Sequence, residues 1–150
     1  MNRVFVGYDR REDEAYRVCR KSILRHSRPM WISKLDIDIL GRAGIYTRKW
    51  YRNVNGQKYD ALDYKPFSTD FAFTRFLVPA LSLYNGWALF CDCDFLFTAD
   101  LGELFSLADP EYAVMCVKHR HVPLESEKMD GVVQTRYFRK NWSSLVLWNC

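Results

Sequence analysis

The segment Trp87-Ala88-Leu89-Phe90-Cys91-Asp92-Cys93-Asp94 is the clearest indicator of the fold in this 150-residue chain. Its first five residues are continuously apolar, which is typical of a central β-strand that is covered on both faces. Two carboxylates separated by one residue follow immediately. Because residues two apart in extended backbone point to the same side, we expect the side chains of Asp92 and Asp94 to converge on one point.

This pair of acids is suited to a divalent cation. Carboxylates are hard oxygen ligands for Mg²⁺ or Mn²⁺, and these cations also bind phosphate oxygens. Two acids next to an apolar strand repel each other unless a cation or a hydrogen-bond donor neutralises them. The simpler alternative is a pair of acids that caps a turn and faces water. The buried strand in front of the pair favours a metal site at Asp92 and Asp94.

Strands and helices alternate around this central strand. Residues 4–6 predict a buried strand that ends in the turn Gly7-Tyr8-Asp9. A helix is predicted from residue 12 onward, with acids at its start, bases toward its end and one apolar stripe that includes Val18 and Leu24. Further strands are predicted at 31–35, 112–117 and 145–148, and a short helix at 100–107. The alternation predicts a single α/β domain over residues 1–150.

Two segments before the central strand are less regular. Residues 41–65 are rich in Tyr, Arg, Asn and Gly and predict an irregular surface excursion, in the role of a lid or a binding loop. Ser68 or Thr69 is then expected to cap a helix that ends at Asn85-Gly86, with Pro79 kinking or splitting it.

Further candidate residues lie outside the Asp-x-Asp pair. The strand end Gly7-Tyr8-Asp9 offers a small residue for close approach of a ligand, a ring that could stack on a base and an acceptor for a ribose or base; an ordinary turn with Asp9 near an N-cap is the alternative. Arg75 is either a helix-surface charge or a fork for phosphate or carboxylate. Lys118 is a similar case, and His119 and His121 are interpreted as exposed loop residues.

Composition narrows the class of protein. Aromatic residues make up 16% and charged residues 27% of the chain, which excludes a globally disordered protein. The net charge of +4 is dispersed. It predicts no nucleic-acid partner and is compatible with an anionic ligand or with peripheral association with a membrane surface.

The cysteines and the chain ends lead to three further expectations. Three of the five cysteines lie in apolar runs, which predicts buried free thiols in a reducing compartment. We do not expect Cys91 and Cys93 to form a thiolate metal site, because no second Cys or His pair lies at zinc-like spacing from them. No run resembles a signal segment or a transmembrane helix, so we expect a soluble cytoplasmic protein. The chain stops two residues after a predicted strand, and we expect a fragment of a larger protein.

With these residues in place, the chain resembles the glycosyltransferases of the GT-A kind, especially glycosyltransferase family 8. The resemblance covers most of the chain and is carried by an ordered set of segments: Gly7-Tyr8-Asp9, residues 68–79 with Arg75, residues 88–94 with the Asp-x-Asp, and the run 142–149 that ends in Asn149.

The resemblance implies a GT-A sheet, incomplete at its C-terminus, and transfer of a hexose to a glycan or lipid-linked acceptor. It implies that Asp92 and Asp94 bind Mn²⁺ or Mg²⁺, which bridges the diphosphate of a nucleotide sugar, usually a UDP-sugar. The implied nucleotide-sugar-binding residues are Gly7, Tyr8, Asp9, Arg75, Asp92, Cys93 and Asn149. Such enzymes usually supply a further metal ligand and the acceptor-binding residues from a C-terminal portion that is not part of this chain. We therefore expect the chain alone not to be a competent transferase.

Three other functions compete with this interpretation. A phosphatase-like fold would use the first Asp as nucleophile, but that motif normally follows the first strand of its domain. A nucleotidyltransferase shares the sheet and the acids, but it typically has a glycine-rich phosphate loop after the first strand. A non-catalytic remnant of a glycosyltransferase is the third. No residue is predicted as catalytic, and the sugar, the acceptor and the stereochemical course are left open.

Overall fold

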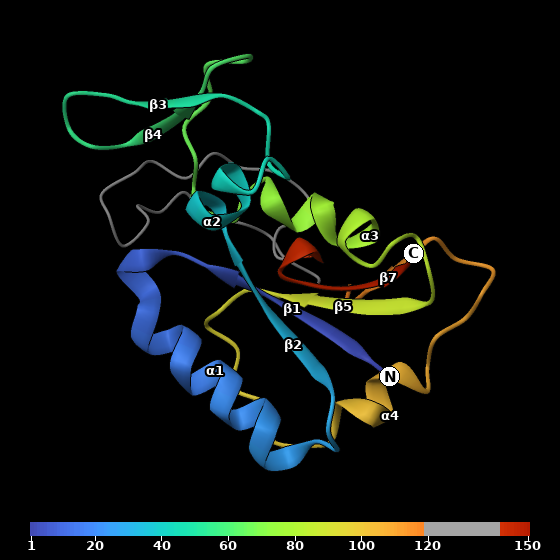
Figure 1. Cartoon of the computed structure of the whole chain (residues 1–150). Helices are drawn as coiled ribbons and strands as arrows, with labels where there is room; N and C mark the ends of the chain where they lie inside the picture. Colours follow the sequence, from blue (N-terminus) through green and yellow to red (C-terminus); the bar gives the residue numbers. More distant parts are fainter. Residues whose placement is uncertain (119–141) are drawn as a thin grey trace.

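The computed structural model describes residues 1–118 and 142–150, which form a mixed α/β fold around a five-stranded sheet (Figure 1). Its strands are β1 (Arg3–Tyr8), β2 (Trp31–Asp36), β5 (Trp87–Cys91), β6 (Val114–Cys116) and β7 (Leu145–Asn149), in the order β2-β1-β5-β7-β6. β1 is parallel to both of its neighbours, whereas β7 is antiparallel to β5 and β6. All five strands were predicted, and the sheet is mixed rather than purely parallel.

Helices flank the sheet on both sides (Figure 1). α1 (Asp13–His26) and α4 (Leu101–Phe105) lie on one side, and α2 (Ile37–Arg42) and α3 (Val78–Leu81) lie on the other. The short 3₁₀ helices η1 (Arg10–Glu12), η2 (Thr74–Leu77) and η3 (Trp142–Ser144) connect these elements. No helix in the described ranges is long and apolar enough to cross a membrane.

The core lies on both faces of β1 and β5, as the apolar run predicts. Val4, Val6, Leu89 and Phe90 are fully buried. Burying such side chains is the main favourable term in folding. The five cysteines are free thiols, and the buried ones are Cys19, Cys91 and Cys93, which confirms that part of the prediction.

Two helix predictions need correction. The apolar stripe of α1 is narrower than predicted, because Val18 and Leu24 are about half exposed. The long helix predicted over 68–85 is wrong: η2 begins only at Thr74, and neither Ser68 nor Thr69 caps it. The predicted split near Pro79 is confirmed, because η2 gives way to α3 there and Pro79 occupies the first turn of α3, where its missing N–H is not needed by the helix.

Residues 41–65 are not the irregular excursion that composition predicts. They contain the antiparallel hairpin of β3 (Trp50–Arg52) and β4 (Lys58–Asp60), which projects from the rest of the molecule (Figure 1). Asp60 is fully buried at its base and accepts hydrogen bonds from Arg48. These bonds lower the pKa of Asp60 to about 2 against the opposing effect of burial. This partly buried ion pair therefore fixes the hairpin to the fold.

Gly7 is explained by packing. A Cβ built there would lie 2.6 Å from ring atoms of Phe71, which covers this end of β1. We predict that Gly7→Ala lowers the free energy of unfolding by about 1–3 kcal/mol because the ring must move. Denaturant unfolding measures this, with Gly41→Ala as a control, since a Cβ built there would lie 4.0 Å from the Tyr46 carbonyl oxygen. Equal stability of Gly7→Ala and the wild type would contradict this role.

Candidate functional site

The candidate site lies where the strand order of the sheet reverses, at the carboxyl ends of β1 and β5. From β1 the chain crosses to β2 on one side, and β5 later joins β1 on the other side. In open α/β sheets, ligands bind outside the carboxyl ends of the strands at such a switch point. The residues at this point are Tyr8 and Asp9 after β1, and Asp92-Cys93-Asp94 after β5.

Asp92 is held firmly at the end of β5. Its backbone N–H donates to the Ser144 carbonyl at 2.8 Å, which extends the pairing of β5 with β7 by one residue. Its Oδ1 lies 3.3 Å from Nη2 of Arg75. Asp94 is exposed in the following turn and forms no hydrogen bond or ion pair within the described ranges.

Electrostatics make Asp92 an unusual carboxylate. Its pKa is raised to about 7, mainly by burial; Arg75 acts in the opposite direction, and the neighbouring carboxylates of Asp94 and Glu12 add to the rise. A bound cation would relieve the repulsion among the acids. Mg²⁺ sites commonly use one or two carboxylates and complete their shell with water and substrate phosphates. The two aspartates fit that pattern.

The structure also limits the metal site. Among the residues it describes, no group of three or more His, Cys, Asp or Glu side chains is placed to hold a metal ion. His119 and His121 lie outside the described residues.

The raised pKa of Asp92 predicts a pH-dependent stability in metal-free buffer. The folded state binds the Asp92 proton more tightly than the unfolded state, so stability decreases as pH rises from about 4 to about 7. Each pKa unit corresponds to about 1.4 kcal/mol. The stability of the wild type relative to Asp92→Asn should therefore fall by roughly 3 kcal/mol between pH 4.5 and pH 7.5. Urea unfolding at several pH values measures this, and parallel curves for the two proteins would contradict it.

Arg75 lies beneath the site rather than in front of it. It is buried, and its Nη1 donates to the Ser143 carbonyl at 2.7 Å. Its guanidinium carbon lies 4.9 Å from the ring centroid of Phe90 and 5.5 Å from that of Phe71. Of the two alternatives from the sequence, the fork aimed at a carboxylate describes Arg75, and that carboxylate is Asp92.

Tyr8, the last residue of β1, lines a cleft beside the site. Its hydroxyl donates to Asp13 at 2.9 Å, and this hydrogen bond, with burial, raises its pKa. Lys34 Nζ lies 3.9 Å from the centroid of its ring, and Tyr16 packs edge-on against it. Tyr8 lines a cleft of about 260 Å³ together with Arg10 and other residues, so part of its ring is accessible to a ligand.

Asp9 is fully engaged by the protein. It is 1% exposed and caps η1, accepting hydrogen bonds from the backbone and the guanidinium of Arg11 and from the Asp70 backbone N–H. Burial alone would raise its pKa, but these hydrogen bonds bring it below its usual range. The N-cap alternative from the sequence therefore describes Asp9, which positions Arg11 and the segment at Asp70.

Three other residues that the resemblance assigns to the donor site either contact other parts of the protein or lie away from the Asp-x-Asp pair. Gly7 faces the Phe71 ring. The thiol of Cys93 is buried and donates to Glu12 at 3.1 Å. Asn149 pairs with Trp87 at the opposite end of β5 from Asp92, and its side chain donates to the Tyr112 carbonyl. The structure therefore does not bring Asn149 to the site.

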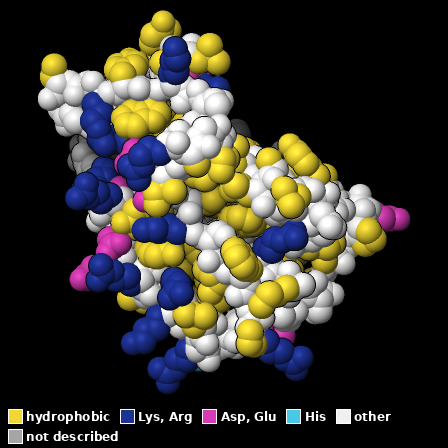
Figure 2. Space-filling view, viewed as in Figure 1, with side chains coloured by type: hydrophobic (Ala, Val, Ile, Leu, Met, Phe, Trp, Pro, Cys, Tyr) yellow, Lys and Arg dark blue, Asp and Glu magenta, His cyan; other side chains and the backbone are white. Residues whose placement is uncertain are grey.

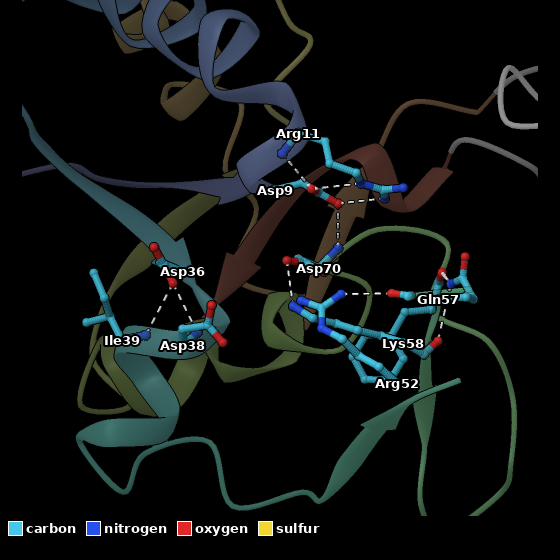
Figure 3. Close-up of polar contacts among 11 residues, drawn as sticks. Asp9, Arg11, Asp36, Asp38, Ile39, Arg52, Gln57, Lys58 and Asp70 are labelled. Carbon is cyan, nitrogen blue, oxygen red and sulfur yellow. Dashed lines mark hydrogen bonds and ion pairs between the residues drawn. The ribbon is translucent and has the colours of Figure 1, made fainter. Parts of the chain in front are cut away.

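The sequence analysis missed a basic cleft next to Asp9. Its volume is about 220 Å³, and the hairpin supplies one wall. The contributing hairpin residues include Arg52, Gln57 and Lys58, which lie near Asp70 (Figure 3), and Arg10 also lines the cleft. A signal was present in the density of basic residues in 48–58, but nothing in the sequence places that segment beside β1. Lys118 is exposed after β6 and lines neither cleft.

Comparison with known proteins shows similarity to a curated plant protein. The chain is 51% identical over 149 residues to "Protein CDI" of Arabidopsis thaliana, an alignment that covers 99% of this chain and 52% of that protein. The chain thus spans about half the length of the curated relative that it matches. No protein-family model matches the chain, and no solved structure matches it significantly.

Proposed function

We propose that this chain forms the nucleotide-sugar-binding part of a metal-dependent glycosyltransferase with a GT-A-type sheet. The proposal includes a UDP-sugar as donor, a saccharide or lipid-linked acceptor, and Mn²⁺ or Mg²⁺ as cofactor. Buried free thiols favour a reducing compartment, so the proposed location is the cytoplasm, with contact to a membrane surface where the acceptor is lipid-linked.

One observation carries the proposal. The Asp-x-Asp follows a fully buried central strand at the switch point of the sheet, and Asp92 lies within electrostatic reach of Asp94 and Glu12. Carboxylates that repel one another at the usual ligand-binding edge are suited to a divalent cation and the phosphates it binds.

Each residue has a role under this proposal. Asp92 and Asp94 would hold the cation, which as a Lewis acid would stabilise the leaving diphosphate. Arg75 fixes the orientation of the Asp92 carboxylate from below. The accessible part of the Tyr8 ring offers a stacking surface for the base. Among the residues that the structure describes, none is assigned as a general base.

Isothermal titration tests the proposal. The purified chain, with its fold checked by circular dichroism, is titrated with UDP-glucose and UDP-galactose in the presence of Mn²⁺ and again with EDTA. Binding that requires Mn²⁺ supports the proposal, and a folded chain that binds neither sugar nucleotide with Mn²⁺ would overturn it.

The same samples separate the competing functions. Metal-dependent binding of UTP or ATP with release of pyrophosphate would indicate a nucleotidyltransferase instead. Donor binding without hydrolysis or transfer of the sugar would indicate a binding half that depends on further protein for catalysis. Thin-layer analysis of the products distinguishes these outcomes.

A further inference from the structure

The basic cleft beside Asp9 has an organisation of its own. It lies between the end of β1 and the β3–β4 hairpin, and its charged lining residues are Asp9, Arg10, Arg11, Arg52, Lys58 and Asp70. Figure 3 shows these walls meeting at Asp70, whose backbone N–H contacts Asp9 and whose side chain contacts Lys58.

Both acids of the cleft are neutralised from within the protein. Arg11 binds the Asp9 carboxylate with Nε at 3.1 Å and Nη2 at 2.9 Å. Lys58 is 3% exposed and donates to Asp70 at 2.6 Å. Buried charges are tolerated when they are paired and hydrogen-bonded in this way. The acids therefore offer little negative charge to a cationic ligand.

Two cations of the cleft have no acidic partner. Neither Arg10 nor Arg52 forms an ion pair with any residue in the ranges 1–118 and 142–150. Arg52 is nonetheless oriented, because its Nη1 donates to the Gly56 carbonyl at 2.8 Å and its guanidinium lies 5.6 Å from the Trp50 ring centroid. A guanidinium held in place loses less freedom when it binds phosphate or carboxylate.

We infer that this cleft is an anion site that binds a phosphate or carboxylate group of a substrate without a metal ion. At about 220 Å³ the cleft is smaller than typical small-molecule sites, so it accommodates one group of a larger ligand. The space-filling view shows Lys and Arg side chains, with fewer Asp and Glu among them, along the flank of the molecule that carries α1 and the hairpin (Figure 2). This surface would draw anions toward the cleft. Only the assignment of the anion to a substrate rests on the proposed function.

Inorganic phosphate in buffer with EDTA tests the inference, because the Asp92–Asp94 site needs a cation to bind phosphate and the cleft does not. Phosphate binding is followed by NMR chemical shifts. We expect millimolar affinity that Arg52→Gln and Arg10→Gln each weaken at least about fivefold. Arg52→Lys should retain part of the affinity, and Arg25→Gln, an exposed residue of α1, should retain all of it. The wild-type affinity should persist in Asp94→Ala.

Two outcomes would overturn the inference: no saturable phosphate binding in EDTA, or binding that Arg10→Gln and Arg52→Gln leave unchanged. Arg10→Gln guards against a hairpin that loosens in Arg52→Gln, because the Arg10 side chain forms no hydrogen bond with a described residue. The source of the anion is then separated with UDP-glucose and glucose 6-phosphate. If Arg52→Gln weakens the binding of UDP-glucose only, the cleft belongs to the donor. If it weakens the binding of glucose 6-phosphate only, the cleft belongs to the acceptor. Failure of Mn²⁺-dependent UDP-sugar binding alone would overturn the proposed function but leave the anion site standing.

Discussion

Replacing Asp94 by Ala is expected to weaken Mn²⁺-dependent binding of a UDP-sugar by at least about 100-fold. The variant removes one of the two carboxylates proposed to hold the cation, and loss even of a group that only supports a metal ligand typically costs 10–100-fold in affinity. Because Asp94 is exposed and forms no hydrogen bond or ion pair with a described residue, its removal should leave the fold intact. Titration calorimetry measures the affinity for the UDP-sugar, and electron paramagnetic resonance measures the amount of bound Mn²⁺.

The control for this prediction is Glu103→Ala, which removes an exposed acid of the first turn of α4. It changes the net charge by the same amount, and Glu103 lines neither the cleft at Asp9 nor the cleft at Tyr8. Unchanged donor binding is expected for Glu103→Ala. If Asp94→Ala bound the donor with Mn²⁺ as tightly as the control, the two-carboxylate metal site would be excluded.

The placement of Asp92 was accessible from the sequence because it depends on local rules. Five consecutive apolar residues identify a strand that is covered on both faces, and β5 is such a strand. A carboxylate directly after that strand must lie at the carboxyl end of the strand. Whether ligands bind at these strand ends depends on which strands are parallel. The parallel pairing of β1 with β2 follows from the β1-α1-β2 connection that the sequence also predicts.

Features that depend on long-range pairing were not accessible. The sequence indicates a strand at 145–148, but not that β7 runs antiparallel to β5, and this direction carries Asn149 to the far end of the sheet. The role of Arg75 depends on Phe90 and on the Ser143 carbonyl, which are far from it in the chain. The hairpin escaped prediction because its strands have only three residues each and are rich in charged and aromatic side chains.

Arg75→Met is expected to destabilise the protein by about 3–5 kcal/mol at pH 8, since removing one partner of a buried ion pair leaves an uncompensated charge. The methionine fills much of the space between the Phe71 and Phe90 rings. It cannot replace the hydrogen bond to the Ser143 carbonyl or the charge next to Asp92. Thermal unfolding in EDTA should show a decrease of roughly 10 °C in the midpoint, from about 2–4 °C per kcal/mol for a chain of this size.

The pH dependence of this loss identifies its cause. Arg75 lowers the pKa of Asp92, so without it the pKa rises above about 7. At pH 5 the carboxyl group is then protonated in the folded state, and the missing cation matters little. At pH 8 the unfolded chain releases the proton freely while the folded state resists doing so, and the cost is at its largest. A loss of stability that is the same at both pH values would show that Arg75 acts through packing and not through Asp92.

A double-mutant cycle completes the test. In the Asp92→Asn background the carboxylate is already absent, so Arg75→Met should cost about 1–3 kcal/mol less at pH 8 than it does in the wild type. The remaining cost measures the contacts with Ser143 and the two rings. If the pair shows this coupling, Arg75 helps to set the position of the Asp92 side chain in the folded protein before any cation binds. Additive effects of the two substitutions would instead assign the position of Asp92 to its backbone bond with Ser144 alone.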